Sequence, residues 1–205
     1  MGGCHHVSDV TARTVAVKNP TSVVLPVSVE RVDACWDRFQ KEHSRAYIRT
    51  EEDAKSVEGG EPGLLVLRGE AVVKDPHDTL LTASSAFGRS EVYVDERGKG
   101  LPYRSDFLVH ATPIDAAQTR VQVEALRSKV ITGTEFTVGH AWEQYVYRDV
   151  PPTTIDEYRV IRCLADCLGV KDGLPPVATP LPKKEADADG LCRTAQRDRD
   201  AGAAQ

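Results

Sequence analysis

The five cysteines are the residues whose chemistry is most readily interpreted. They are Cys4, Cys35, Cys163, Cys167 and Cys192. No C-x-x-C motif occurs, and the further ligands that a zinc site would need are not visible at a recognisable spacing. Cysteine is often buried as a small apolar residue, and we predict this for Cys35, Cys163 and Cys167. An odd count leaves one cysteine over if the others pair, and the sequence leaves open whether Cys35, Cys163, Cys167 and Cys192 do so.

Motifs for covalent or phosphate chemistry are missing from the sequence. It contains no G-x-S-x-G, no S-x-x-K and no G-x-x-x-x-G-K-[ST]. His140 and Glu143 would lie on opposite faces of the strand predicted there. The segment from Asp75 to Asp78 has the polar groups to bind a cation, but Asp followed by Pro is typical of a turn. We therefore predict a protein that is not an enzyme and has neither metal nor cofactor, with an enzyme of unrecognised site as one alternative.

Four aromatic residues are candidates for the lining of an apolar ligand cavity. They are Trp36, Trp142, Tyr145 and Tyr158. A sheet wrapped around a long helix commonly forms a pocket between the two. The other interpretation is that these residues only fill the core, because protein interiors are close-packed.

Composition and charge restrict the class of protein. The chain has 205 residues, of which 40% are hydrophobic and 28% charged, a balance typical of a globular domain. With 26 basic and 31 acidic residues, the net charge is −5. This argues against a nucleic-acid-binding domain, which needs a cationic face. The longest apolar run is Leu64–Leu67, so we expect no transmembrane helix.

The spacing of apolar residues predicts the elements that position these side chains. A helical period predicts a helix from Ser28 to about His43. Strands are predicted at 23–25, within 63–73, and at 91–94, 103–112, 119–125 and 134–147. We expect an α+β fold, with an antiparallel sheet of about five to seven strands and two helices packed on one face.

The second helix has the clearest local signals in the sequence. Thr154 and Glu157 form a T-x-x-E capping box. An apolar face follows from Ile155 to Leu168, and Gly169 is a typical helix terminator.

Composition also predicts the domain boundaries. Residues 1–22 have little periodicity and are expected to be a flexible tether. Residues 23–170 are expected to form a single α+β domain. Residues 171–205 hold four prolines and no aromatic residue, so we expect a disordered tail.

The segment Met1-Gly2-Gly3-Cys4 resembles the end of a bacterial lipoprotein signal, although the apolar part of such a signal is missing. The Pro-Thr-Thr turn into the last helix is similar to endings in uncharacterised bacterial lipoproteins, and the element order resembles BamC-like or helix-grip domains. The resemblance implies lipid attachment at Cys4 and a periplasm-facing position in the bacterial envelope. It also implies a non-enzymatic role in binding a protein or small partner. The alternative is a soluble, cytoplasmic helix-grip protein that binds an apolar ligand between its sheet and its last helix.

Overall fold

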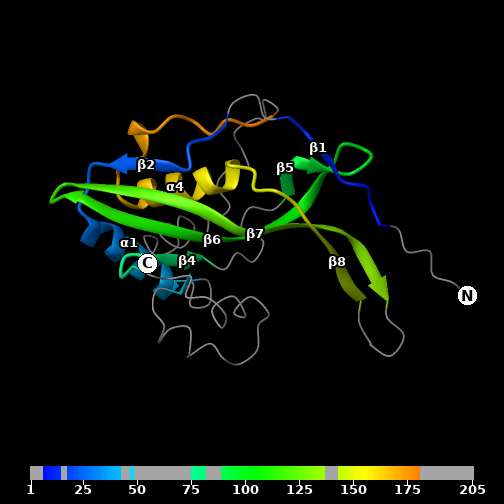
Figure 1. Ribbon diagram of the computed structural model, residues 1–205, viewed down its shortest axis with the longest axis horizontal. Coiled ribbons are helices and arrows are strands. Elements are labelled where there is room, and N and C mark those ends of the chain that lie inside the picture. The colour runs from blue at the N-terminus through cyan, green and yellow to red at the C-terminus, as the bar shows by residue number, and fades with distance from the viewer. Residues whose placement is uncertain are drawn as a thin grey trace, which may run out of the picture.

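A long antiparallel hairpin of β6 (Gly100–Asp115) and β7 (Gln118–Phe136) forms the centre of the sheet (Figure 1). The computed structural model describes residues 7–14, 18–42, 47–48, 75–81, 89–136 and 143–180. Val109 pairs with Val123, and the next pair on the same face is Ala111 with Val121. Opposed residues of paired strands project to one side of a sheet, so the alternating apolar residues of both strands build one apolar surface.

At the hairpin's turn end, three strands widen the sheet. β4 (Thr79–Leu81) pairs with β6, β3 (Tyr47–Ile48) pairs with β4, and β2 (Ser22–Leu25) pairs with β7. All three pairings are antiparallel.

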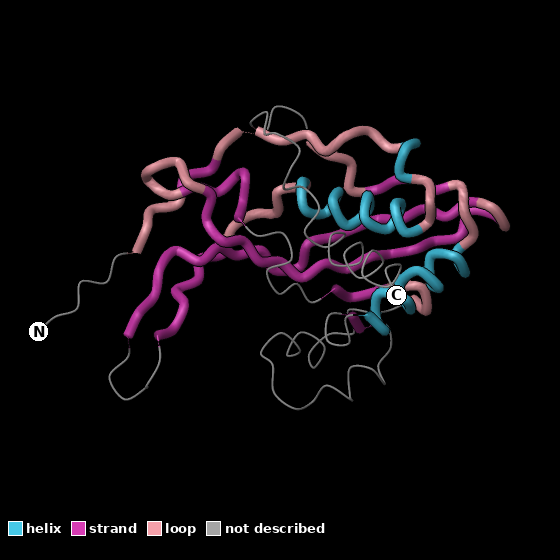
Figure 2. The backbone as a smooth tube through the Cα atoms, turned by 180° about the vertical axis from the view of Figure 1, so that it is seen from behind, coloured by secondary structure: helices cyan, strands magenta, loops and turns pink. Residues whose placement is uncertain are grey.

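Three further strands widen the sheet at its other end, which brings the described strands to eight. β5 (Arg89–Val94) pairs with β6, β1 (Thr11–Ala12) pairs with β5, and β8 (Glu143–Asp149) pairs with β7. β8 and the adjoining part of β7 extend away from the two helices (Figures 1 and 2). The sheet therefore has one end that packs against the helices and one end that projects.

Both helices pack on the apolar face of the hairpin. α1 (Val29–Glu42) contributes Val32 and Trp36 to the same buried cluster as Val109. α4 (Ile155–Cys167) contributes Ile161 and Leu164 to that cluster. The structure thus confirms the α+β fold with an antiparallel sheet and two helices on one face. No described helix is long and apolar enough to cross a membrane.

The strand predicted at 134–147 differs from the structure. β7 continues from Gln118 to Phe136, and β8 begins at Glu143. The two segments are paired with each other, with Phe136 opposite Glu143, so a single continuous strand is wrong. Alternation of apolar residues occurs in both segments and does not show where the chain reverses. The strands predicted within 63–73 lie outside the described residues.

The start of α4 is capped one residue earlier than the T-x-x-E motif predicts. Thr153 Oγ1 accepts hydrogen bonds from the backbone N–H groups of Ile155 (3.2 Å) and Asp156 (3.4 Å), and it donates to Asp156 Oδ2 (2.9 Å). Thr154 has φ 63° and makes no side-chain cap. Its Oγ1 accepts instead from the backbone N–H of Asn19 (3.2 Å). At the other end, Gly169 terminates the helix with φ 73°, as predicted.

Both predicted tails contain segments that belong to the folded domain. Asn19 is buried, and its side-chain amide makes two hydrogen bonds of 2.8 Å with the backbone of Ala178. A short 3-10 helix spans Lys171–Gly173, and Pro175 O accepts a hydrogen bond from Tyr158 Oη (2.7 Å). The ordered domain therefore extends on both sides of the expected range 23–170. Residues 181–205 lie outside the described residues.

Candidate functional site

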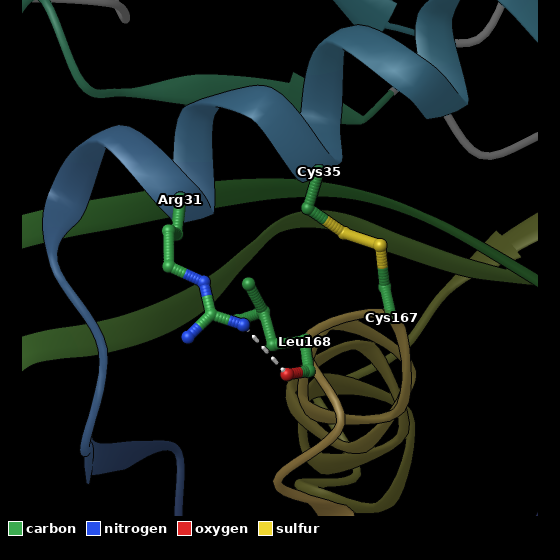
Figure 3. The surroundings of a disulfide bond; sticks show 4 residues. All are labelled: Arg31, Cys35, Cys167 and Leu168. Carbon is green, nitrogen blue, oxygen red and sulfur yellow. Dashed lines mark hydrogen bonds between the residues drawn. A yellow bond between two sulfur atoms is a disulfide. The ribbon is translucent and has the colours of Figure 1, made fainter.

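A disulfide bond joins the two helices. Cys35 of α1 and Cys167 of α4 are 132 residues apart in the sequence, and their Cα atoms are 6.3 Å apart (Figure 3). Cys163 is also disulfide-bonded. The predicted burial is confirmed for Cys35 and Cys163, at 1% and 6% exposure, and the pairing that the sequence left open is seen for Cys35 with Cys167. The sequence could not show this, because helix periodicity places cysteines on a face without revealing which cysteines of other elements they meet.

A hydrogen bond supports the same junction. Arg31 Nη2 donates to the carbonyl oxygen of Leu168 at the end of α4 (3.2 Å), beside the disulfide (Figure 3). A cation is favourable at a helix C-terminus, where carbonyl groups lack partners within the helix. Together the two bonds attach the first half of α1 to the C-terminal end of α4.

The structure brings two of the predicted cavity residues, Trp36 and Tyr158, together and places Tyr145 apart from them. Trp36 and Tyr158 lie in the same buried cluster, at 2% and 0% exposure. Tyr145 lies on β8 and is 56% exposed. It therefore does not line a cavity with the other two. Trp142 lies outside the described residues, as do Cys4 and His140.

A buried ionic cluster lies at the start of α4. Arg159 Nη2 lies 2.6 Å from Glu91 Oε1 on β5, and Arg159 Nη1 lies 3.1 Å from Asp156 Oδ1. Asp156 and Arg159 are 4% and 8% exposed. Burial raises the pKa of the Asp156 carboxyl, while Arg159 and Thr153 act in the opposite direction. Sequence analysis missed this cluster, although an Asp and an Arg three residues apart on a largely apolar helix are a recognisable signal.

Glu157 is the buried acid next to Asp156, and it forms no ion pair with a described residue. It is 2% exposed, and its Oε2 atom has no hydrogen-bond partner among the described residues. Burial raises the pKa of its carboxyl to about 7, and the neighbouring Asp156 adds to this effect. Hydrogen bonds from the backbone N–H groups of Glu157 and Thr154 lower this pKa and partly offset the rise. The carboxyl therefore changes charge near neutral pH inside the protein.

Two Asp–His pairs lie near the turn before β4. His77 Nδ1 is 2.8 Å from Asp33 Oδ2, and His110 Nδ1 is 2.8 Å from Asp78 Oδ1. The turn predicted from Asp75 to Asp78 is confirmed, because the backbone N–H of Asp78 donates to Asp75 O (3.0 Å). A carboxylate on Nδ1 fixes the orientation of an imidazole and leaves Nε2 available. Within the described parts of the chain, no group of three or more His, Cys, Asp and Glu could hold a metal ion.

The chain matches no protein family model, and comparisons with curated proteins and with solved structures found no similar protein.

Proposed function

We propose that this chain is an exported domain of the bacterial cell envelope that binds a partner and does not catalyse a reaction. The observation that carries the proposal is the disulfide between Cys35 and Cys167. Disulfides persist in oxidising compartments such as the bacterial periplasm and are rare in the cytosol, where thiols are kept reduced. The cytoplasmic alternative does not account for a disulfide that joins the two main helices.

The placement of the polar groups favours binding over catalysis. Arg159, Asp156 and Glu91 neutralise one another in the interior. No described cysteine is an unpaired thiol that could serve as a nucleophile. Trp36 and Tyr158 pack as core residues, which weakens the case for an apolar ligand between the sheet and α4.

Cys4 is the proposed point of lipid attachment. The small residues Gly2 and Gly3 precede it, as in the lipoprotein signal that this segment resembles. A single acyl chain gives only marginal membrane binding, so stable anchoring needs the several chains that are typical of bacterial lipoproteins. The domain would then face the periplasm on a short tether.

The intact mass of the protein from its native cells tests the anchor. We expect a chain that begins at Cys4 and carries acyl groups, found in the membrane fraction. The Cys4→Ser variant should lack the added mass and leave that fraction. An unmodified Cys4 would contradict the anchor, while the state of Cys35 and Cys167 would still test export separately.

A further inference from the structure

Two tyrosines are exposed on the projecting strand β8. Tyr145 and Tyr147 are 56% and 41% exposed, and their ring centroids are 6.4 Å apart in an edge-on arrangement. They are two of the five exposed large hydrophobic residues among the described residues. β8 and the end of β7 lie away from the helices, as Figure 1 shows, so neither helix covers these rings.

Two cations lie against one of these rings. Lys129 Nζ is 4.7 Å from the centroid of the Tyr147 ring, and Arg104 Cζ is 5.8 Å from it. Arg104 Nη1 also donates to Tyr147 Oη (3.2 Å). Arg104, Lys129, Tyr145 and Tyr147 are called the β8 face below.

The cations of the β8 face have no carboxylate partner within the described residues. The neighbouring carboxylate of Asp106 is held by Arg127 instead. Asp149 is opposite Lys129 in the strand register, but no ion pair joins the two. Arg104 Nε is buried and has no hydrogen-bond partner there. The surface therefore offers two positive charges that form no ion pair with a described residue, beside exposed aromatic rings, on a chain whose net charge is −5.

One edge of β8 also lacks a partner among the described strands. β8 pairs with β7 and with no other described strand. Edge strands present backbone N–H and C=O groups that can accept a further strand, and proteins often protect them with proline or inward-facing charge. β8 contains no proline, and its central residues are Tyr145, Val146 and Tyr147.

We infer that an extended acidic peptide segment of a partner protein adds as a strand beside β8, with its carboxylates against Arg104 and Lys129. Main-chain hydrogen bonds supply affinity in this mode of recognition, and side-chain contacts supply selectivity. The cations select an acidic segment by charge complementarity, and the tyrosine rings bind its carbon chains. The inference rests on the proposed binding role and specifies the chemistry of the partner.

The unpaired edge favours a peptide over an acidic polysaccharide. Tyrosine rings and cations would serve either ligand, but only a polypeptide can extend the hydrogen-bond ladder of β8. Protection of the β8 amides from hydrogen exchange therefore distinguishes a bound peptide from a bound polysaccharide.

Poly-L-glutamate is a suitable probe for this site. Its binding is measured by calorimetry at pH 7.5 and low salt, and hydrogen exchange of the β8 amides is the second readout. We expect binding that weakens with added salt and protects the amides of β8. Lys129→Glu and the double variant Tyr145→Ser, Tyr147→Ser should each weaken binding by about tenfold or more. Asp149→Asn should strengthen it, because it removes the negative charge opposite Lys129.

Ile114→Ser is the matched control, since Ile114 is also exposed (45%) but lies near the turn between β6 and β7. It should bind as the unmodified protein does, and thermal unfolding should show that every variant folds. Absence of poly-L-glutamate binding, or binding that the β8 variants leave unchanged, would overturn the inference. Binding of hyaluronate with equal strength and no β8 protection would also overturn it. None of these results bears on the disulfide or the lipid anchor, which are measured independently.

Discussion

Burial of the Glu157 carboxyl makes the stability of this protein depend on pH. The pKa of this group is about 7 in the folded protein, compared with an ordinary value of 4.5. The folded state therefore binds more protons than the unfolded state between these two values. The contribution of Glu157 to the free energy of unfolding is fully present below pH 4.5. It is lost as the pH rises to about 7, by an amount on the order of 3 kcal/mol.

Replacement of Glu157 by Gln should remove this part of the pH dependence. Glutamine keeps the shape of the side chain and stays neutral, so Glu157→Gln should be more stable than the unmodified protein at pH 8 and similar to it at pH 4.5. Urea unfolding across this range measures the difference. Glu124→Gln, at an exposed position on β7, should leave the profile unchanged. An equally steep fall in stability for Glu157→Gln would show that another group is responsible.

The start of α4 depends on Thr153 more than on Thr154. Thr153 accepts two backbone hydrogen bonds of the first turn, whereas Thr154 has a left-handed backbone that is unfavourable for a β-branched residue. Thr153→Ala should lower the free energy of unfolding by about 1 kcal/mol, the usual effect of removing an N-cap.

The comparison variant for this cap is Thr154→Ala, measured by the same urea unfolding. It loses the acceptor for the Asn19 N–H but relieves the β-branched residue at positive φ, so its loss of stability should be smaller. A larger loss for Thr154→Ala would mean that the capping box predicted from the sequence is the one that matters.

The sequence was most informative where a pattern is local. The helical period of Val29, Val32 and Trp36 predicted α1, and the alternation from Thr119 to Ala125 predicted part of β7. The α+β class followed from the order of these elements. Gly169 was predicted as the end of α4 because positive φ favours glycine there.

Features that depend on contacts between distant segments could not be predicted. The disulfide joins residues 132 positions apart, and Glu91 meets Arg159 only when β5 lies beside α4. Glu157 was predicted as a capping residue, and its burial results from packing of the helix on nearly all sides. Tyr145 was assigned to the cavity because several aromatic residues lie close together near the end of the predicted sheet, but β8 projects away from the helices and exposes it.

The disulfide between Cys35 and Cys167 is expected to contribute strongly to the stability of the whole domain. It closes a loop of 132 residues, and long loops restrict the unfolded chain most. The double variant Cys35→Ala, Cys167→Ala should lower the free energy of unfolding by about 2 to 5 kcal/mol in the absence of reductant. Urea unfolding measures this loss, and addition of reductant should destabilise the unmodified protein in the same direction. A variant as stable as the unmodified protein would contradict a structural role for the bond.

The proposal that this domain works in an oxidising compartment, with α1 linked to α4, depends on the state of Cys35 and Cys167 in the cell. A non-reducing peptide map of the protein from its native cells, with free thiols alkylated at lysis, measures that state. We expect a peptide pair linked through Cys35 and Cys167, with neither residue alkylated. Alkylation of both residues would show that the protein is reduced in the cell and would contradict the proposal of an exported domain.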